Sequence, residues 1–198
     1  MNTESKDEII KAEVLKSAAE LFQQWGLNKT TMEDIAKRAG KGKSTLYYYF
    51  KSKEEIFEAV VMKEAADISR ITLEAVEKSR TAGEKLQAYA QVGFSEVKKR
   101  ANLYDIVRKE IREMNVLLKS IRGRIDTLDI NMVQKILVFG IRNGEFMLFN
   151  EEELRLLSSM IVSSFRSIQM ELLLEEKYYD QKIRIDFMTS ILVKGLSK

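Results

Sequence analysis

The sequence predicts an all-α protein, and three observations support that prediction. The 198 residues include no proline and only nine glycines, the two residue types that break or weaken helix interiors. Apolar residues recur at spacings of three and four, the period of an amphipathic helix, and the alternation of a strand is absent. Ser or Thr followed three residues later by Glu, a pattern typical of helix starts, occurs at Ser5–Glu8, Thr30–Glu33, Ser52–Glu55 and Thr81–Glu84.

These signals divide the chain into about nine expected helices. Gly26 and Gly40 stand where the first two should end. We expect a three-helix N-terminal domain at residues 1–53 and a C-terminal helical bundle at residues 54–198. The expected helices cover residues 6–25, 32–39, 44–50, 53–79, 82–101, 103–118, 119–144, 151–177 and 181–196.

The composition excludes most classes of enzyme. The chain has no cysteine and no histidine, and therefore lacks a thiol nucleophile, the commonest general base and the commonest transition-metal ligands. An enzyme that uses carboxylates in the C-terminal bundle stays open, but no paired-carboxylate motif supports it. We expect no cofactor, no metal site and no catalytic residue. The polar N-terminus and the lack of an apolar run of about 18 residues predict a cytoplasmic protein without a membrane partner.

The positive charge is concentrated near the N-terminus. Residues 1–53 carry ten Lys or Arg and seven Asp or Glu, which accounts for the whole net charge of +3. Between Lys37 and Lys53 there are six basic residues and no acidic one. A local basic patch on an otherwise neutral chain favours a polyanionic partner, although a solvated helix face has the same composition.

The segment from Met32 to Phe50 has the pattern of a helix-turn-helix. Two short helices flank a turn that contains glycine, and the second helix is aromatic with Lys43, Ser44 and Thr45 at its start. Such a helix can enter the major groove of DNA, where its first side chains reach base edges and phosphates. The three consecutive tyrosines, Tyr47 to Tyr49, cannot all be buried on so short a helix.

The run TTMEDIAKRAGKGKSTLYYYFKSKEEI resembles the DNA-binding signature of the tetracycline-repressor (TetR) family, and the preceding AAELFQQWGLNKTT is similar to that family's first helix. The chain departs from the family at Lys41, where an apolar residue is usual, and at Gly42, where Ser or Thr is usual. The resemblance implies base-reading residues at Lys43, Ser44, Thr45 and Tyr48, and phosphate contacts at Thr31, Tyr47, Tyr49 and Lys53.

The helix expected over residues 151–177 has apolar residues on more than one side, which predicts one face inside the subunit and another across a two-fold axis. With the last helix it would form a homodimer interface. The alternative is a wholly intramolecular core. The expected interface residues are Leu157, Ile161, Phe165, Ile168, Phe187 and Ile191.

The resemblance further implies a repressor that binds a near-palindromic DNA operator and is released by a small molecule. A helical DNA-binding regulator without an effector, controlled by protein contacts, is the alternative. The resemblance places the recognition helix at residues 44–50, and helix 53–79 follows it without a linker. We therefore expect ligand-induced movement of helix 53–79 to reach the DNA-binding domain. The large side chains expected around the ligand are Tyr89, Phe94, Tyr104, Met132, Phe139 and Phe165, although each also fits a plain core.

Overall fold

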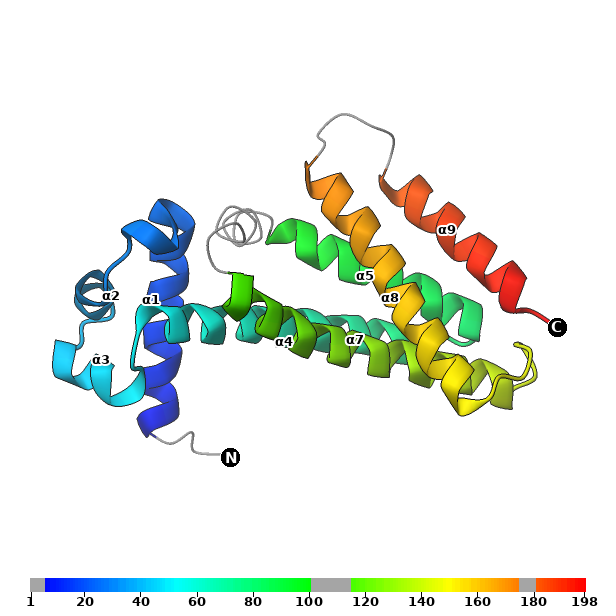
Figure 1. Ribbon diagram of the computed structural model, residues 1–198, viewed down its shortest axis with the longest axis horizontal. Helices are drawn as coiled ribbons and strands as arrows, with labels where there is room; N and C mark the ends of the chain where they lie inside the picture. Colours follow the sequence, from blue (N-terminus) through cyan, green and yellow to red (C-terminus); the bar gives the residue numbers. More distant parts are fainter. Residues whose placement is uncertain (1–5, 101–114, 175–180) are drawn as a thin grey trace. The chain divides into compact units, whose positions relative to one another are not determined.

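The computed structural model describes residues 6–100, 115–174 and 181–198, and within them the chain is helical, as predicted (Figure 1). The expected helix over 103–118 lies mostly outside the described residues. The helices are α1 (Lys6–Lys29), α2 (Met32–Arg38), α3 (Lys43–Tyr49), α4 (Lys53–Lys78), α5 (Ala82–Lys99), α7 (Asn115–Arg142), α8 (Glu151–Leu174) and α9 (Gln181–Leu196).

Helix α7 begins at Asn115 and not at residue 119, and two other helix boundaries differ from the expectation for local reasons. Gly26 does break α1, with φ at 80°, but a further turn carries the helix on to Lys29. The N-cap of α2 is Thr31 with Asp34, and not Thr30 with Glu33. Thr30 is unavailable because its hydroxyl donates a hydrogen bond to the carbonyl of Gly26 at 2.7 Å, so the next threonine caps the helix.

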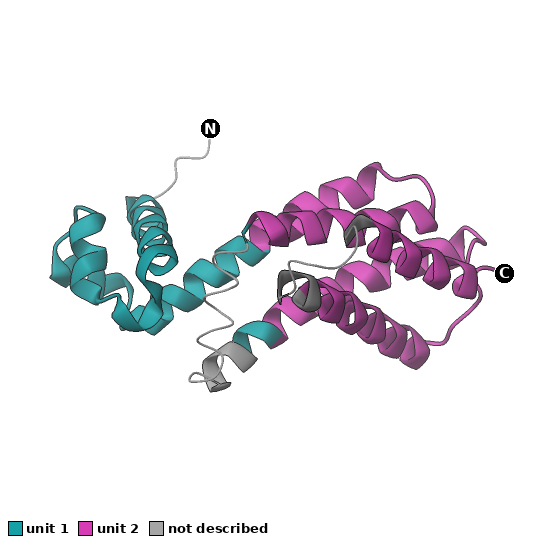
Figure 2. Cartoon of the chain, turned by 90° about the horizontal axis from the view of Figure 1, so that it is seen from above, with its two compact units in different colours: residues 1–65, 100–122 teal, residues 66–99, 123–198 magenta. Residues whose placement is uncertain are grey.

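The chain divides into two compact units (Figure 2). Unit 1 comprises residues 1–65 and 100–122, and unit 2 comprises residues 66–99 and 123–198. Helix α4 contributes its first half to unit 1 and its second half to unit 2. The functional boundary expected at residue 53 stays a prediction, because compactness alone does not assign function.

The core of unit 1 joins α1, α2 and α3 to the first turns of α4. The ring edge of Phe22 packs against Phe57, with the centroids 5.4 Å apart. Trp25 is 44% exposed, and Phe22 provides the large buried ring of α1. Burial of each such side chain stabilises the fold by about 1.5–3 kcal/mol. Other members of this core are Val14, Ala18, Leu21, Leu27, Ile35, Leu46 and Ile56.

The core of unit 2 is a helical bundle in which α5 packs on α8 and α9. The carboxylate of Asp186 on α9 accepts hydrogen bonds from the amides of Gln87 and Gln91 on α5. The turn after α7 joins the C-terminus, since the amide of Met147 donates to the carbonyl of Leu196 at 2.9 Å. The bundle therefore ties the end of the chain to its interior.

Gly140 lets α7 approach its neighbours. A Cβ at this position would overlap the buried ring of Phe146 and lie 2.8 Å from the Cβ of Ala82. The sequence GIRNGEF thus forms the junction between α7 and α8, where Gly144 takes a positive φ of 73°. The glycine at 140 is required for packing rather than for its backbone angles.

Replacing Gly140 with alanine should destabilise the protein by about 1–3 kcal/mol, because the added methyl group overpacks a rigid contact. Gly123→Ala is the matched control in the same helix, where a Cβ meets nothing within 4 Å. That change should be neutral or stabilising by up to about 1 kcal/mol. Urea denaturation measures both, and equal midpoints for the two variants would contradict the packing role.

Candidate nucleic-acid interface

The turn between α2 and α3 fixes the direction of the second helix. Gly40 takes a left-handed conformation with φ at 63°, and the amide of Lys41 donates to the carbonyl of Ala36 at 3.0 Å. Gly42 is extended and is the N-cap of α3, and its carbonyl accepts a hydrogen bond from the amide of Leu46 at 3.1 Å. Leu46 is fully buried and anchors α3 to the domain. Helix α2 packs on both α1 and α3.

The outward face of α3 carries the residues expected to read DNA. Lys43, Ser44, Tyr47 and Tyr48 are exposed and lie at spacings of one and four, which places them on one side of a helix. Tyr48 is 78% exposed and Tyr47 is 48% exposed, so neither phenol belongs to the core. Thr45 is half-buried. The helix thus presents one ammonium, one hydroxyl and two phenols to a partner.

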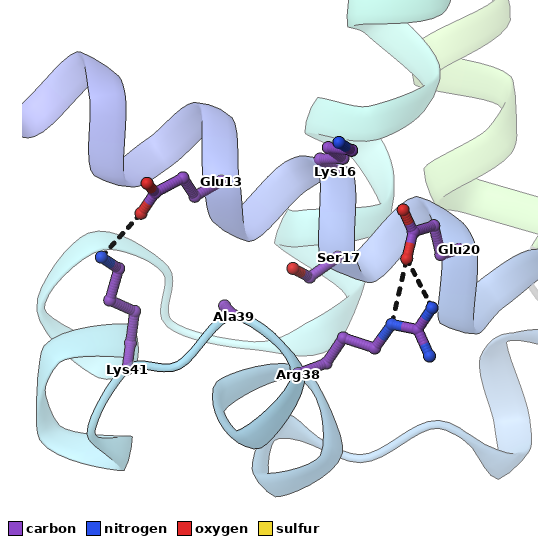
Figure 3. Close-up of a pocket in the computed structure, with 7 residues that line it drawn as sticks. All are labelled: Glu13, Lys16, Ser17, Glu20, Arg38, Ala39 and Lys41. Carbon is purple, nitrogen blue, oxygen red and sulfur yellow. Dashed lines mark hydrogen bonds and ion pairs between the residues drawn. The ribbon is translucent and has the colours of Figure 1, made fainter.

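Two ion pairs clamp this turn to α1 around an open hollow (Figure 3). The guanidinium of Arg38 contacts the carboxylate of Glu20 through Nε at 3.0 Å and a terminal nitrogen at 2.6 Å. The ammonium of Lys41 lies 2.6 Å from Glu13, while its side chain is only 27% exposed. Lys41 therefore replaces the apolar contact usual at this position by packing its stem and pairing its charge.

Tyr49 contacts a carboxylate on the first turn of α1. Its hydroxyl donates to Asp7 at 2.6 Å, and the ammonium of Lys11 lies 5.9 Å from its ring centroid. The hydrogen bond to Asp7, together with desolvation, raises the pKa of Tyr49 to about 12. Sequence reasoning missed Asp7, which looked like an ordinary acidic residue near a helix start.

Thr31 and Lys43 also have acidic neighbours. The hydroxyl of Thr31 lies 2.6 Å from the carboxylate of Asp34, and the hydrogen bonds from Thr31 hold the pKa of Asp34 below its ordinary value. The ammonium of Lys43 lies 3.6 Å from Glu33, with both side chains mostly exposed. Such surface pairs contribute little to stability, so a phosphate can replace them.

Lys53 has a different environment from the one expected of a phosphate contact. Its ammonium donates to the carbonyls of Leu27, Asn28 and Thr30 at 3.0, 3.1 and 3.2 Å. An ammonium has three N–H groups, and all three are used in this arrangement. Lys53 begins α4, and its three partners end α1 and lead into α2. The contact favours a positioning role for Lys53 between these helices.

The described residues expected to line the ligand lie in the core of unit 2 or against it. Tyr89, Phe94, Met132 and Phe165 are buried, and Phe139 packs beside them. Tyr104 lies outside the described residues. The rings of Tyr89 and Phe165 meet edge to face with centroids 6.0 Å apart, and the ammonium of Lys85 lies 4.8 Å from the ring centroid of Phe139.

A charged cluster that the sequence did not reveal lies near these rings. Arg166 on α8 pairs with Asp126 and Asp129 on α7, and the three side chains are 17%, 32% and 27% exposed. Burial raises the pKa of Asp129 to about 6. Burial also raises the pKa of Tyr89, and the charge of Asp129 raises it further. In the described part of the chain, no three carboxylates gather as a metal site would require.

The expected dimer residues fall into two groups. Ile161 and Phe165 are 2% and 3% exposed, because they face the core of unit 2, and Leu157 and Ile168 are partly buried against it. Phe187 and Ile191 are exposed by 67% and 52%. Large exposed apolar side chains that the sequence analysis did not single out for the interface are Leu156 and Met160 on α8 and Ile183 on α9.

Comparisons with known proteins match this architecture. Residues 14–60 match the model of a family described as bacterial regulatory proteins, tetR family. The fatty acid metabolism regulator protein of Bacillus subtilis (strain 168) is 26% identical over 184 residues, covering 93% of this chain and 94% of that protein.

No described helix is long and apolar enough to cross a membrane.

Two solved structures share the fold over nearly the whole chain. FadR from Bacillus subtilis, crystallised with stearoyl-CoA, has a TM-score of 0.74 and 25% identity, covering 93% of this chain and 98% of that one. FadR from Bacillus halodurans has a TM-score of 0.75 and 19% identity, covering 98% of each chain. The chain therefore resembles the TetR family of transcriptional regulators in its helix-turn-helix segment and in its fold. It is a DNA-binding regulator, with a helix-turn-helix in unit 1.

Replacing Lys53 with methionine should weaken operator binding without changing its salt dependence, because the ammonium positions α1 and α4. A phosphate contact would instead reduce the slope of log affinity against log salt by about one. Lys43→Met is the control, since the ammonium of Lys43 is exposed on α3 and, on entering the major groove to reach base edges, would also neutralise phosphate charge. We expect only the control to reduce the slope in binding titrations at several salt concentrations. A reduced slope for Lys53→Met would restore the phosphate assignment.

Replacing Asp7 with asparagine should tighten operator binding roughly threefold to tenfold at low salt, because a negative charge beside α3 disappears. The pKa of Tyr49 should fall from about 12 towards its ordinary value, which a pH titration of the tyrosine ring by NMR can follow. Glu8→Gln removes the same charge one residue away. Equal effects of the two variants on affinity would mean that Asp7 acts only through net charge.

Proposed function

We propose that the protein is a transcriptional repressor that binds a near-palindromic operator as a homodimer and is released by a long-chain acyl-CoA. The observation that carries the effector class is the match along nearly the whole chain to a regulator crystallised with stearoyl-CoA. The match of residues 14–60 to the tetR family model supports the repressor, and the exposed face of α3 supports its contact with the major groove. The site of action is the cytoplasm, where the operator lies.

In this proposal, DNA recognition is divided among the exposed residues of unit 1. Lys43, Ser44, Thr45 and Tyr48 read base edges, which carry sequence information, and Thr31, Tyr47 and Tyr49 contact phosphates. Thr31 and Tyr49 would exchange their carboxylate partners for phosphate oxygens, which accept the same hydrogen bonds. Lys53 keeps its backbone partners and holds the domain in shape.

The effector occupies the aromatic interior of unit 2. Its acyl chain packs against Tyr89, Phe94, Met132, Phe139 and Phe165, whose apolar surfaces suit a hydrocarbon chain. The residues that hold a ligand here carry no catalytic role in this proposal, and we assign the protein no enzymatic activity. The regulator without an effector is the outcome if no acyl-CoA binds.

Helix α4 couples the effector to the DNA. Its start is fixed in unit 1 by Lys53 and by its cap, in which the amide of Glu55 donates to the hydroxyl of Ser52 at 3.2 Å. Its second half buries Ile68, Thr72 and Val76 in unit 2. An effector that prefers another position of α4 would change the distance between the two helix-turn-helix domains of the dimer. That distance must match the half-site spacing of about 34–36 Å on DNA.

The homodimer forms through the exposed apolar stripes of α8 and α9. Leu156 and Met160 lie four residues apart on α8, and Ile183, Phe187 and Ile191 repeat at intervals of four on α9. Large apolar side chains exposed in such rows mark an interaction surface. The buried residues Ile161 and Phe165 support these helices from inside the subunit.

Stearoyl-CoA should weaken operator binding by about 5–150-fold, the range of a typical coupling free energy of about 1–3 kcal/mol. The operator is first selected from random duplex DNA, which should yield a two-fold motif. Fluorescence anisotropy then measures its affinity with and without stearoyl-CoA, with free CoA as the control. Tight binding of stearoyl-CoA that leaves operator affinity unchanged would refute release by the effector.

Charge on the exposed stripes should dissociate the dimer, because ionised side chains would be buried in an apolar contact. We expect Leu156→Glu with Phe187→Glu to sediment as a folded monomer at micromolar concentration and to lose operator affinity. Leu148→Glu is the control, since Leu148 is 77% exposed outside both stripes. A wild-type chain that is already monomeric, or a double variant that stays dimeric, would contradict this interface.

A further inference from the structure

Thr72 carries an unpaired hydroxyl in the core of unit 2. Its side chain is 3% exposed, and its Oγ1 finds no hydrogen-bond partner among the described residues. Two other buried hydroxyls of unit 2 donate hydrogen bonds to carbonyls of their own helix. Thr189 donates to the carbonyl of Ile185 at 2.7 Å, and Ser158 donates to that of Leu154 at 2.7 Å. Thr72 is therefore an exception, and a buried unpaired hydroxyl destabilises a fold.

Gly93 lies opposite this hydroxyl, in the interior of α5. A Cβ built at Gly93 would meet one atom within 4 Å, the Oγ1 of Thr72 at 3.8 Å, so the structure has room for a methyl group. Glycine weakens a helix interior relative to alanine, and no positive φ requires it here. An unpaired hydroxyl and a glycine in a helix interior, both of which destabilise the fold, thus lie together between α4 and α5.

The surroundings of this point restrict what can bind there. Tyr89 lies one helical turn before Gly93 on the same face of α5, and its ring packs on Phe165. The carboxylates of Asp126 and Asp129 share Arg166 near Tyr89, which disfavours a second anion. The hydroxyl of Thr72 is a hydrogen-bond donor without an acceptor, beside the apolar core of unit 2. This chemistry suits a neutral group that carries an oxygen acceptor.

We propose that Thr72 and Gly93 form a subsite that binds the carbonyl oxygen of the effector's thioester. The hydroxyl of Thr72 donates to this oxygen, and the missing side chain of Gly93 leaves space for the linear acyl chain. The subsite rests on the proposed acyl-CoA effector and deepens it. It selects a thioester over a free fatty acid, whose carboxylate would lose its hydration beside Asp126 and Asp129.

Two substitutions test the subsite, because each should stabilise the protein and weaken effector binding. Thr72→Val removes the unpaired hydroxyl with little change of shape, and Gly93→Ala fills the space with a methyl group. We expect both to raise the urea midpoint and to weaken stearoyl-CoA about tenfold, which corresponds to about 1.4 kcal/mol. Thr189→Val, equally buried but with a bonded hydroxyl, should lower the midpoint and leave the affinity unchanged.

A ligand without the carbonyl completes the test. The thioether S-octadecyl-CoA should bind the wild type about tenfold more weakly than stearoyl-CoA and should not distinguish wild type from Thr72→Val. Equal affinity of stearoyl-CoA for wild type and Thr72→Val would overturn the subsite, even if stearoyl-CoA still releases DNA.

Failure of stearoyl-CoA to bind the wild type would reject the proposed effector class and the thioester subsite with it. The urea midpoints then decide whether the hydroxyl of Thr72 is unpaired. A fall for Thr72→Val like that for Thr189→Val would show that the hydroxyl has a partner, and would overturn the unpaired site on which the inference stands.

Discussion

The arrangement of unit 1 depends on the ammonium of Lys53, which is bonded to three backbone carbonyls where α1 ends and α2 is about to begin. Carbonyls at a helix end have no partners in their own helix, so a cation there satisfies them and offsets the negative end of the helix dipole. Because Lys53 is the first residue of α4, the same contact joins α4 to the frame that carries α3. The adjoining cap at Ser52 and Glu55 joins α4 to the end of α3. A displacement of the start of α4 would therefore act directly on α3.

The positive surface of the helix-turn-helix is balanced by carboxylates of the same domain. Glu13 and Glu20 pair with Lys41 and Arg38 at the turn, and Asp7 accepts from Tyr49. These contacts hold α1, the turn and α3 together when DNA is absent, and they lower the net attraction for any polyanion. Such a balance favours binding that needs correct geometry over binding by charge alone, which is the sequence-independent part of DNA affinity.

The fold was predictable because its signals are local, whereas the contacts that define the site are not. The absence of proline and the capping residues predicted the helices, and the pattern of α3 predicted its exposed face. Asp7 and Tyr49 are 42 residues apart, and the partners of Lys53 are backbone carbonyls, which no sequence pattern marks. Helix α8 illustrates the limit, because apolar residues on two sides predicted two packed faces without telling which one lies inside. The structure places Ile161 in the core and leaves Leu156 exposed.

If effector and operator compete through α4, calorimetry of stearoyl-CoA binding with and without saturating operator will show the competition. Linkage requires the operator to weaken effector binding by the same factor by which the effector weakens operator binding. We expect equal factors between about 5 and 150 for the wild type. Effector affinity that is the same in the presence and absence of operator would contradict it.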